Sequence, residues 1–239
     1  MIMSNTKYKI RKDLSIEFEG HTLYRIEATR NIDCDIIKGH LGGYIEEENN
    51  LSRYDNCWIY DNAKVFDNAF IHHNARIFGN AQIYGNAVIY GYADVFNNAQ
   101  VFGGARIYGN ANILDNAIIK DKVHISDYVI IAGNSIINSY TRLFGYARIF
   151  HNMIVSNTED VIFIGPIGSR EAYTTFIKQD DVIYVTCGCF FGNIEEFEKA
   201  VMKHPNRKHC DDYMDTIEYI KKRFNTIDKY KSEKSSTNE

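Results

Sequence analysis

Apolar and polar residues recur with a period of six along the middle of the chain, as in "AQIYGNAVIYGYADVFNNAQVFGG" (residues 81–104). Each unit contains a small residue, an aliphatic residue two places later, usually an aromatic residue, and then two residues that are mostly Gly, Asp or Asn. The aliphatic position keeps its register without a slip from Ile59 to Val155. Side chains two residues apart point to one face of a strand, and Gly, Asp and Asn tolerate the left-handed backbone of a sharp corner. The pattern therefore predicts short strands separated by corners.

A repeat of six residues excludes two common architectures. On an α-helix of 3.6 residues per turn, it would distribute the aliphatic residues around all sides. In an antiparallel sandwich, strands and turns rarely keep one register for about a hundred residues. A parallel β-helix fits the pattern, because three hexads form one triangular turn and stacked turns pair their strand backbones. We therefore predict a mainly β protein built on a parallel β-helix.

The two ends of such a stack need caps, because each open end exposes unpaired backbone N–H or C=O groups that favour aggregation. The period changes outside the central region of the chain. We assign residues 1–50 to an N-terminal β cap, 51–157 to the β-helix and 158–225 to a C-terminal α/β cap. The last residues, 226–239, are polar and predict a frayed tail.

Each cap has elements of its own. In the N-terminal cap, "KYKIRK" and "SIEFEGHTLYRIEA" predict two strands, with residues 19–21 turning between the halves of the second. In the C-terminal cap, "DVIFIGPIG" and "YTTFIKQDDVIYVTCGCF" are strand-like, and residues 179–181 predict a hairpin turn. Two helices follow, of which the first begins at Asn193 with Glu196 in a near capping box. The second carries an apolar stripe, formed by Tyr213, Ile217, Ile220 and Phe224.

The hexads resemble those of the hexapeptide-repeat proteins, whose pattern has an aliphatic residue first and a small residue fifth, as in "VFDNAF" (residues 65–70). That family forms left-handed β-helices, so the resemblance implies a left-handed coil. The aromatic residue after each aliphatic one departs from the acyltransferase members, which prefer small or acidic residues there. Residues 7–224 are also similar to uncharacterised phage and prophage proteins. The likeness rests on the repeats together with an opening stretch, "GHTLYRIEATRNIDCDIIKGHLGGYIEEENNLS", and an ending stretch, "IGSREAYTTFIKQDDVIYVTCGCFFGNIEEFEKAV". The likeness implies a viral origin and supplies no established activity.

The composition limits the classes of function. No apolar run approaches the roughly 18 residues of a membrane span, and the N-terminus lacks the apolar core of a signal peptide. Five cysteines at irregular spacing suit a reducing compartment, so we expect a cytoplasmic protein, in the host cell if it is phage-encoded. Residues 57–155 hold seven basic residues and six aspartates, a near balance that argues against a nucleic-acid partner.

Aromatic side chains 18 residues apart are expected to stack in ladders on all three faces of the prism. One interpretation of the ladders is a platform for bases or sugars, and the other is packing within the chain combined with an oligomer interface. Faces covered with Tyr and Phe exceed what a monomer usually exposes, so we expect a homo-oligomer, and a trimer in particular. The predicted interface residues are Tyr84, Tyr90, Phe96, Phe102 and Tyr108.

Histidine and cysteine offer two further alternatives. Hexapeptide acyltransferases use a His base near a subunit boundary, usually beside a loop that interrupts the coil, and the candidates here are His72, His73, His124 and His151. No insertion interrupts the hexads between residues 57 and 155, so the sequence shows no loop that could form an acceptor pocket. The residue types of a zinc site, at a spacing that does not match one, occur in Cys187, Cys189, His204, His209 and Cys210. We assign no metal ligand, catalytic residue or cofactor.

Residues 165–176, "GPIGSREAYTTF", form the most site-like stretch of the chain. Arg170 offers a planar fork of donors suited to phosphate or carboxylate, and hydroxyls come from Ser169, Thr174 and Thr175. These four residues predict an anion-binding site. The alternative is a polar loop in which Arg170 pairs with a nearby acid.

Together these features favour a binding protein over an enzyme. The repeat would serve as a rigid ruler and an oligomer-forming surface, while specificity lies at its ends. With the viral resemblance, we expect the protein to sequester an anionic, nucleotide-derived host signal or to block a host defence protein. Two other classes stay open: a hexapeptide-family acyltransferase, and a structural virion or scaffold component.

Overall fold

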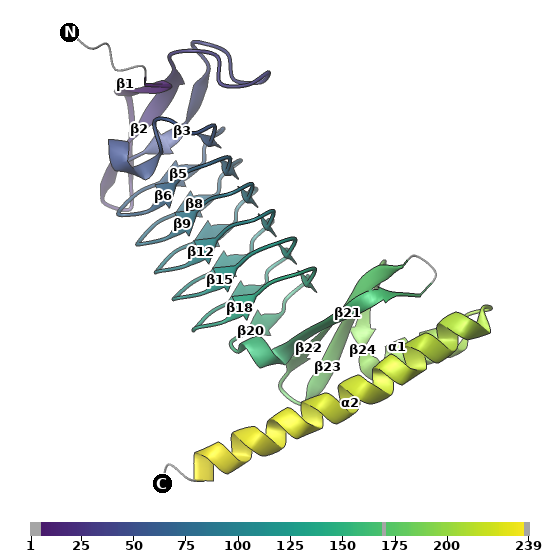
Figure 1. Ribbon diagram of the computed structural model, residues 1–239. Helices are drawn as coiled ribbons and strands as arrows, with labels where there is room; N and C mark the ends of the chain where they lie inside the picture. Colours follow the sequence, from purple (N-terminus) through teal and green to yellow (C-terminus); the bar gives the residue numbers. More distant parts are fainter. Residues whose placement is uncertain (1–5, 169–170, 237–239) are drawn as a thin grey trace.

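The computed structural model describes residues 6–168 and 171–236. A long three-sided β-helix forms the middle of the molecule, with the N-terminal strands at one end and a small sheet with two helices at the other (Figure 1). The prediction of a mainly β protein with a parallel β-helix and a C-terminal α/β cap is confirmed. The left-handed coil stays a prediction from the resemblance.

Three parallel sheets form the sides of the prism. Face A contains β5 (Lys64–Val65), β8 (Gln82–Ile83), β11 (Gln100–Val101), β14 (Ile118–Ile119), β17 (Ile136–Ile137) and β20 (Ile154–Val155). Face B contains β6 (Phe70–Ile71), β9 (Val88–Ile89), β12 (Arg106–Ile107), β15 (His124–Ile125) and β18 (Arg142–Leu143). Face C contains β4 (Trp58–Ile59), β7 (Arg76–Ile77), β10 (Asp94–Val95), β13 (Asn112–Ile113), β16 (Ile130–Ile131) and β19 (Arg148–Ile149).

The second residue of each of these strands points into the prism and forms the core. Ile83, for example, has an exposed fraction of 0% and lies between Val65 and Val101 of the neighbouring turns. The small residue two places before it, Ala81, is equally buried. The aliphatic and small columns that the hexads predict are therefore the core, and the first strand residue and the aromatic residue point outward.

The corners have left-handed backbone at every sixth residue from 61 to 151. At Gly133, with φ of 70°, a Cβ atom would come within 2.4 Å of the backbone oxygen of His151, so only glycine fits there. Aspartates at other corners join successive turns, because the Asp61 carboxylate accepts a hydrogen bond from the backbone N–H of Gly79 at 3.0 Å. The corner chemistry predicted from Gly, Asp and Asn is confirmed.

The N-terminal cap is continuous with face A. Strands β1 (Tyr8–Phe18) and β2 (His21–Ala28) form an antiparallel hairpin, and β3 (Leu41–Ile45) pairs with both β2 and β5. The turn at residues 19–21 is confirmed, but the expected break after "KYKIRK" is wrong, because β1 continues through a bulge. A short 3₁₀ helix, η1 (Glu48–Asn50), follows β3. The first turn of the prism thus begins inside the range 1–50.

Donors from the N-terminal cap satisfy the open C=O end of the prism. The buried ammonium group of Lys7 donates to the backbone oxygens of Asp55 and Cys57, both at 2.6 Å. The Tyr8 hydroxyl contacts the backbone oxygen of Leu51 at 3.0 Å as a donor. Burial lowers the pKa of Lys7, because desolvation disfavours its charge. Charged and hydroxyl donors therefore replace the strand N–H groups that an additional turn would supply.

The C-terminal cap is a four-stranded antiparallel sheet covered by two helices. It begins with the 3₁₀ helix η2 (Thr158–Asp160), and the sheet contains β21 (Val161–Ile167), β22 (Ala172–Gln179), β23 (Val182–Cys187) and β24 (Phe190–Asn193). The hairpin turn predicted between β22 and β23 is confirmed. The helix α1 (Ile194–Met202) begins at Asn193, which forms a complete capping box with Glu196.

Acceptors from the C-terminal cap satisfy the opposite, N–H end of the prism. On each face of the last turn, one backbone N–H group donates its hydrogen bond to a side-chain oxygen instead of a backbone carbonyl. The pairs are Arg142 with Thr158 Oγ1 at 2.8 Å on face B, Arg148 with Thr175 Oγ1 at 2.9 Å on face C, and Ile154 with Gln179 Oε1 at 2.8 Å on face A. The two caps therefore match the polarity of the parallel strands.

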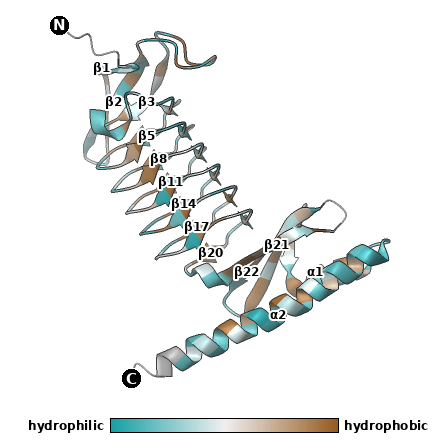
Figure 2. Cartoon of the chain, viewed as in Figure 1, coloured by the Kyte–Doolittle hydropathy of each residue, from teal (hydrophilic) through white to brown (hydrophobic). Residues whose placement is uncertain are grey.

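The second helix, α2 (Arg207–Ser236), crosses the cap sheet and extends beyond it (Figure 1). Hydrophilic and apolar residues alternate along it (Figure 2), and the predicted apolar stripe is buried at Ile217, Ile220 and Phe224. The frayed tail expected for 226–239 is wrong as far as residue 236, because Ile227 is buried and Lys231 contacts Asp160 at 2.7 Å. Neither described helix is long and apolar enough to span a membrane.

Candidate functional site

The loop predicted to bind an anion is only partly described. Ser169 and Arg170 lie outside the described residues, so their part of the prediction stays untested. The hydroxyls of Thr174 and Thr175 are buried and serve the fold: Thr174 contacts the sulfur of Cys187 at 3.2 Å, and Thr175 accepts the N–H of Arg148. Both hydroxyls therefore have partners within the fold, and the anion-binding site stays a prediction.

The predicted aromatic ladders are present on all three faces. On face A, Tyr84 stacks between Phe66 and Phe102, with ring centroids 5.0 and 4.7 Å apart. On face B, Tyr90 and Tyr108 stack at 4.9 Å, and on face C the ladder starts with Tyr60 and Phe78 at 4.3 Å. The five predicted interface residues, including Phe96 on face C, are half-buried along the prism. Stacking within the chain accounts for part of this burial, and the trimer stays a prediction.

The four histidines considered as bases lie in three different settings. His72 and His73 are adjacent near the N-terminal cap, where burial lowers the pKa of His72. His124 lies on face B, whereas His151 contacts the ring of Phe191 in the C-terminal cap, with centroids 3.8 Å apart. Strands and corners repeat without an insertion from residue 57 to 155, all of which the structure describes. The coil between residues 57 and 155 therefore offers no loop of the kind that forms the acceptor pocket in hexapeptide acyltransferases.

The cysteines considered for a zinc site lie in different surroundings. Cys187 contacts Thr174 and the hydroxyl of Tyr213, while the sulfur of Cys210 contacts backbone oxygens, including that of Val201 at 3.1 Å. Cys189 is exposed. Among the described residues these sulfurs form no cluster that could hold a metal ion.

A row of basic side chains occupies the C-terminal half of face B. Arg106, His124 and Arg142 are the outward residues of β12, β15 and β18, and they pair in register across adjacent strands. Burial lowers the pKa of His124, and the two arginines lower it further, so this imidazole is neutral near pH 7. Within the described part of the chain, neither arginine forms a salt bridge. We call this row of Arg106, His124 and Arg142 the basic strip, because it carries two arginines without a salt-bridge partner.

The acids near this strip are engaged elsewhere. Asp121 accepts a hydrogen bond from the backbone N–H of Ser139, and Asp127 accepts one from that of Gly145, at 2.9 and 2.8 Å. Lys122, at the corner before β15, lies 5.6 Å from the ring centre of Tyr140 and adds another positive charge. The side-chain oxygens of these aspartates therefore bond to backbone donors, and neither aspartate forms a salt bridge with Arg106 or Arg142 in the described structure.

Beside the basic strip, the aromatic column of face B has a gap. Tyr90 and Tyr108 are followed, one turn each, by Ser126 and then by Phe144, which is 55% exposed. Ser126 is only 8% exposed despite its small side chain, so larger neighbours flank it. The serine interrupts the column of aromatic rings formed in the preceding turns. This gap lies in the same turn as His124.

A family model described as the YdcK beta solenoid repeat matches residues 81–95. The matched segment contains β8, β9 and β10, one strand from each face, and so corresponds to most of one turn. The protein is a β-solenoid repeat protein. No curated protein matches the chain. The match concerns the solenoid architecture, and neither an activity nor the closeness to phage proteins follows from it.

Sequence reasoning missed the strip on face B and its gap, although the signal was present. Arg106, His124 and Arg142 are spaced by 18 residues, the period of one turn, as are Tyr108, Ser126 and Phe144. We counted Arg106 and Arg142 only toward the overall charge balance, and we considered His124 only as a possible base. Assigning each charge to a face of the predicted prism would have revealed the strip.

Proposed function

We propose that this β-solenoid protein binds an anionic small molecule on face B without transforming it. The observation that carries the proposal is the register of Arg106, His124 and Arg142 without an acidic partner. The two arginines flank His124, and each lowers the pKa of the imidazole, so the three side chains do not stabilise one another electrostatically. The fold does not require them, because the same outward position in other turns of face B holds Phe70 and Val88.

The chemistry of the strip fits phosphate. Arginine presents a planar fork that pairs with two oxygens of a phosphate or carboxylate, and adjacent strands place successive side chains about 4.8 Å apart. A phosphate at the level of His124 would reach both Arg106 and Arg142. Its negative charge would offset their repulsion and would favour the protonated imidazole.

The gap beside the strip narrows the class of ligand to one with a planar ring. A base placed over Ser126 would lie between the rings of Tyr108 and Phe144, and stacking of this type contributes about 1–3 kcal/mol per base. Phosphate on the strip and a base in the gap describe a nucleotide. Under the viral resemblance, we propose that the protein sequesters a nucleotide-derived defence signal in the cytoplasm of an infected host.

Calorimetry against mono-, di- and cyclic nucleotides and nucleotide sugars tests the proposal. Arg106→Gln and Arg142→Gln should each weaken binding tenfold or more, because each removes a charge-assisted contact. Ser126→Tyr should abolish binding of bases but preserve the fold, because tyrosine stacks at the same position in two preceding turns. Mass spectrometry should recover the ligand chemically unchanged.

Arg148→Gln is the matched control for these variants. Arg148 occupies the same strand position in the last turn but lies on face C. If no ligand of the panel binds, or if Arg148→Gln weakens binding as much as Arg142→Gln, the strip is not a binding site. Turnover of an acyl-CoA by the parent protein would instead favour the acyltransferase alternative.

Assembly into a homotrimer is a second candidate function, and the outer column of face C favours it. This column is apolar in every turn, with a second copy of the chain as the proposed occupant: Tyr60, Phe78, Phe96, Leu114, Ala132 and Phe150. Such a continuous stripe is typical of an interface. Sedimentation at low micromolar concentration should show a trimer that Phe96→Lys dissociates, and a monomeric parent would refute the assembly. Presence in purified virus particles would favour a structural component.

A further inference from the structure

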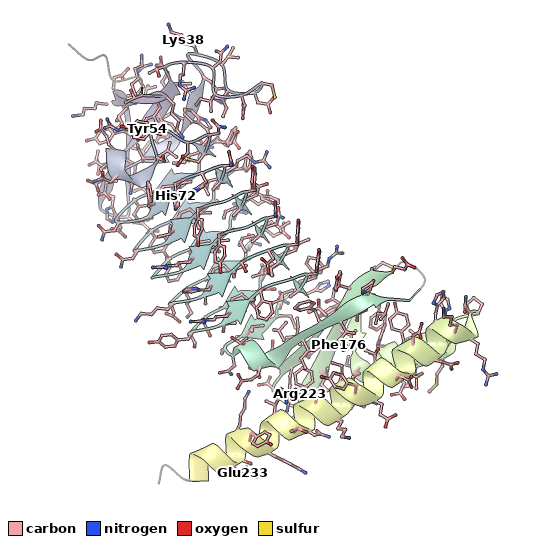
Figure 3. The ribbon with its side chains drawn as sticks, in the orientation of Figure 1. Lys38, Tyr54, His72, Phe176, Arg223 and Glu233 are labelled. Atoms are coloured by element: carbon pink, nitrogen blue, oxygen red, sulfur yellow. The ribbon has the colours of Figure 1, made fainter. Side chains whose placement is uncertain are left out.

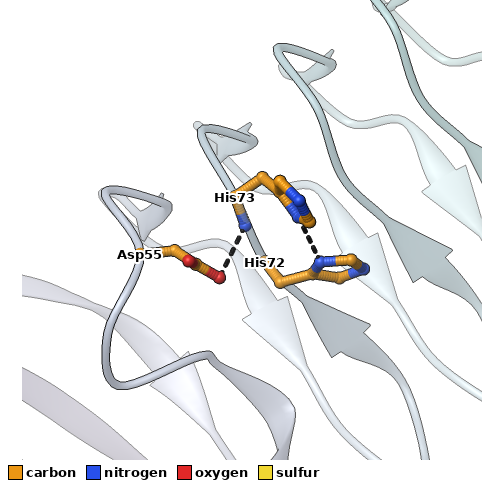
Figure 4. Close-up of side chains that lie close together, drawn as sticks. All are labelled: Asp55, His72 and His73. Atoms are coloured by element: carbon orange, nitrogen blue, oxygen red, sulfur yellow. Dashed lines mark hydrogen bonds between the residues drawn. The ribbon is translucent and has the colours of Figure 1, made fainter.

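A second group of polar side chains lies at the N-terminal end of face B, two strands before the basic strip begins. It consists of Asp55, His72 and His73 (Figure 4), and His72 is labelled near the N-terminal cap in Figure 3. Each residue presents one oxygen or nitrogen atom that could ligate a metal, and these atoms all lie within 4.8 Å of one another. The group contains two imidazoles and one carboxylate.

The two imidazoles face each other through the same type of nitrogen atom. The Nδ1 atoms of His72 and His73 are 2.5 Å apart, so they can share one hydrogen at most. Two nitrogen ligands of a tetrahedral zinc ion, each about 2.0–2.1 Å from the metal, lie about 3.3 Å apart. The exposed His73 ring can open the distance by this amount through a small rotation.

Neighbouring groups hold the three side chains in place. The His72 ring is stacked on Phe70 and on Tyr90, with centroids 4.8 and 5.0 Å away. His73 occupies a corner with φ of 60°, and its backbone N–H donates to Oδ2 of Asp55 at 2.9 Å. This bond holds the carboxylate beside the corner of His73, and the Asp55 side chain also hydrogen-bonds with Ser52. The site is therefore positioned before any metal arrives.

We propose that Asp55, His72 and His73 form a binding site for a transition-metal ion such as Zn²⁺. Two imidazole nitrogens and one carboxylate oxygen suit zinc, copper, nickel and iron, and they leave at least one coordination position open. Two other groups of side chains in the described structure could also hold a metal ion, but they are less suited to it. The imidazole of His21 already pairs with Glu46 at 2.9 Å, and the group formed by residues 33–35 is fully exposed and drawn from one loop.

Zinc titration of the full chain, with Co²⁺ as a spectroscopic probe, tests the site. The parent protein should bind one equivalent at this site, and Zn²⁺ should raise its Tm. Three conservative variants should each weaken binding tenfold or more. Asp55→Asn keeps an acceptor for the N–H of His73, His72→Phe keeps the stacking on Tyr90, and His73→Asn tolerates the left-handed corner.

The control is His151→Asn, which changes a histidine at the same type of corner, with φ of 68°, in the last turn. It should bind zinc as the parent protein does. Melting curves without metal show whether each variant is folded. The proposal is overturned if the parent protein binds no zinc or cobalt, or if the folded His72→Phe and Asp55→Asn variants bind as tightly as the parent. The test does not depend on nucleotide binding.

Discussion

Replacing Thr175 with valine tests whether side chains of the C-terminal cap stabilise the open end of the prism. Thr175 is fully buried, and its hydroxyl accepts the backbone N–H of Arg148 at 2.9 Å. Valine has nearly the same shape as threonine but no hydrogen-bond acceptor. The backbone N–H of Arg148 would therefore lose its only partner in the described structure. No strand beyond β19 could replace it, because β19 is the edge of its sheet.

The expected loss follows from the cost of an unpaired, partly buried N–H group. Such a group costs about 1–3 kcal/mol. In a chain of this size each kcal/mol changes Tm by about 2–4 °C. The matched control is Thr186→Val, because Thr186 lies directly opposite Thr175 on β23. Within the described part of the chain the Thr186 hydroxyl is buried without a hydrogen-bond partner, so its removal should be neutral or stabilising.

Two measurements distinguish the variants. Chemical denaturation gives the difference in free energy of unfolding between Thr175→Val and Thr186→Val. Hydrogen exchange of the Arg148 amide reports the end of face C directly, and its protection should fall in Thr175→Val alone. Equal stability of the two variants, together with unchanged exchange at Arg148, would refute the capping role of Thr175.

Three further predictions concern the core, the N-terminal cap and α2. Ile83→Asp should destabilise the fold by about 3–5 kcal/mol, because it buries a charge, whereas Tyr84→Ser should cost about 1–2 kcal/mol of stacking; equal small losses in denaturation would contradict the register. The hydrogen bond that the His21 imidazole donates to the Glu46 carboxylate raises the pKa of His21 above 6.5. Its stabilisation is therefore fully present below pH 6.5 and lost as pH rises through the higher folded-state pKa. The Tm difference between the parent and Glu46→Gln should shrink over that range, and a constant difference would exclude the pair. Deleting 226–239 should lower stability by about 1.5–3 kcal/mol, because it removes a buried isoleucine, and an unchanged Tm would show that this part of α2 is dispensable.

The prism itself follows from the sequence, because its determinants are local and repeated. Alternation of side chains along a strand places Ile83 and Ala81 inside, and the corner residues are chosen for left-handed backbone. A period of six that never slips allows only one stacking register. The same register also placed Arg106, His124 and Arg142 in one row, which made the basic strip predictable in principle.

Asp55 was harder to assign, because the hexads become irregular before residue 57. Its bond to His73 has the 18-residue spacing of the other corner bonds, such as that of Asp61 with Gly79. The first turn, however, is completed by β3 and by the isolated pairing of Leu51 with Ile71. Neither contact follows from a repeat. The metal-site proposal therefore required the tertiary structure.

The ends of the molecule were decided by tertiary structure alone. Thr175 looked like a ligand residue because hydroxyls and Arg170 share one loop, yet the register of β22 against the last turn directs its hydroxyl to Arg148. The polar segment after residue 225 has little apolar periodicity, and contacts with η2 and β22 keep it helical, including that of Lys231 with Asp160. Repeated local preferences determine the turns of a solenoid, but where it stops depends on single, non-local contacts that satisfy its last backbone groups.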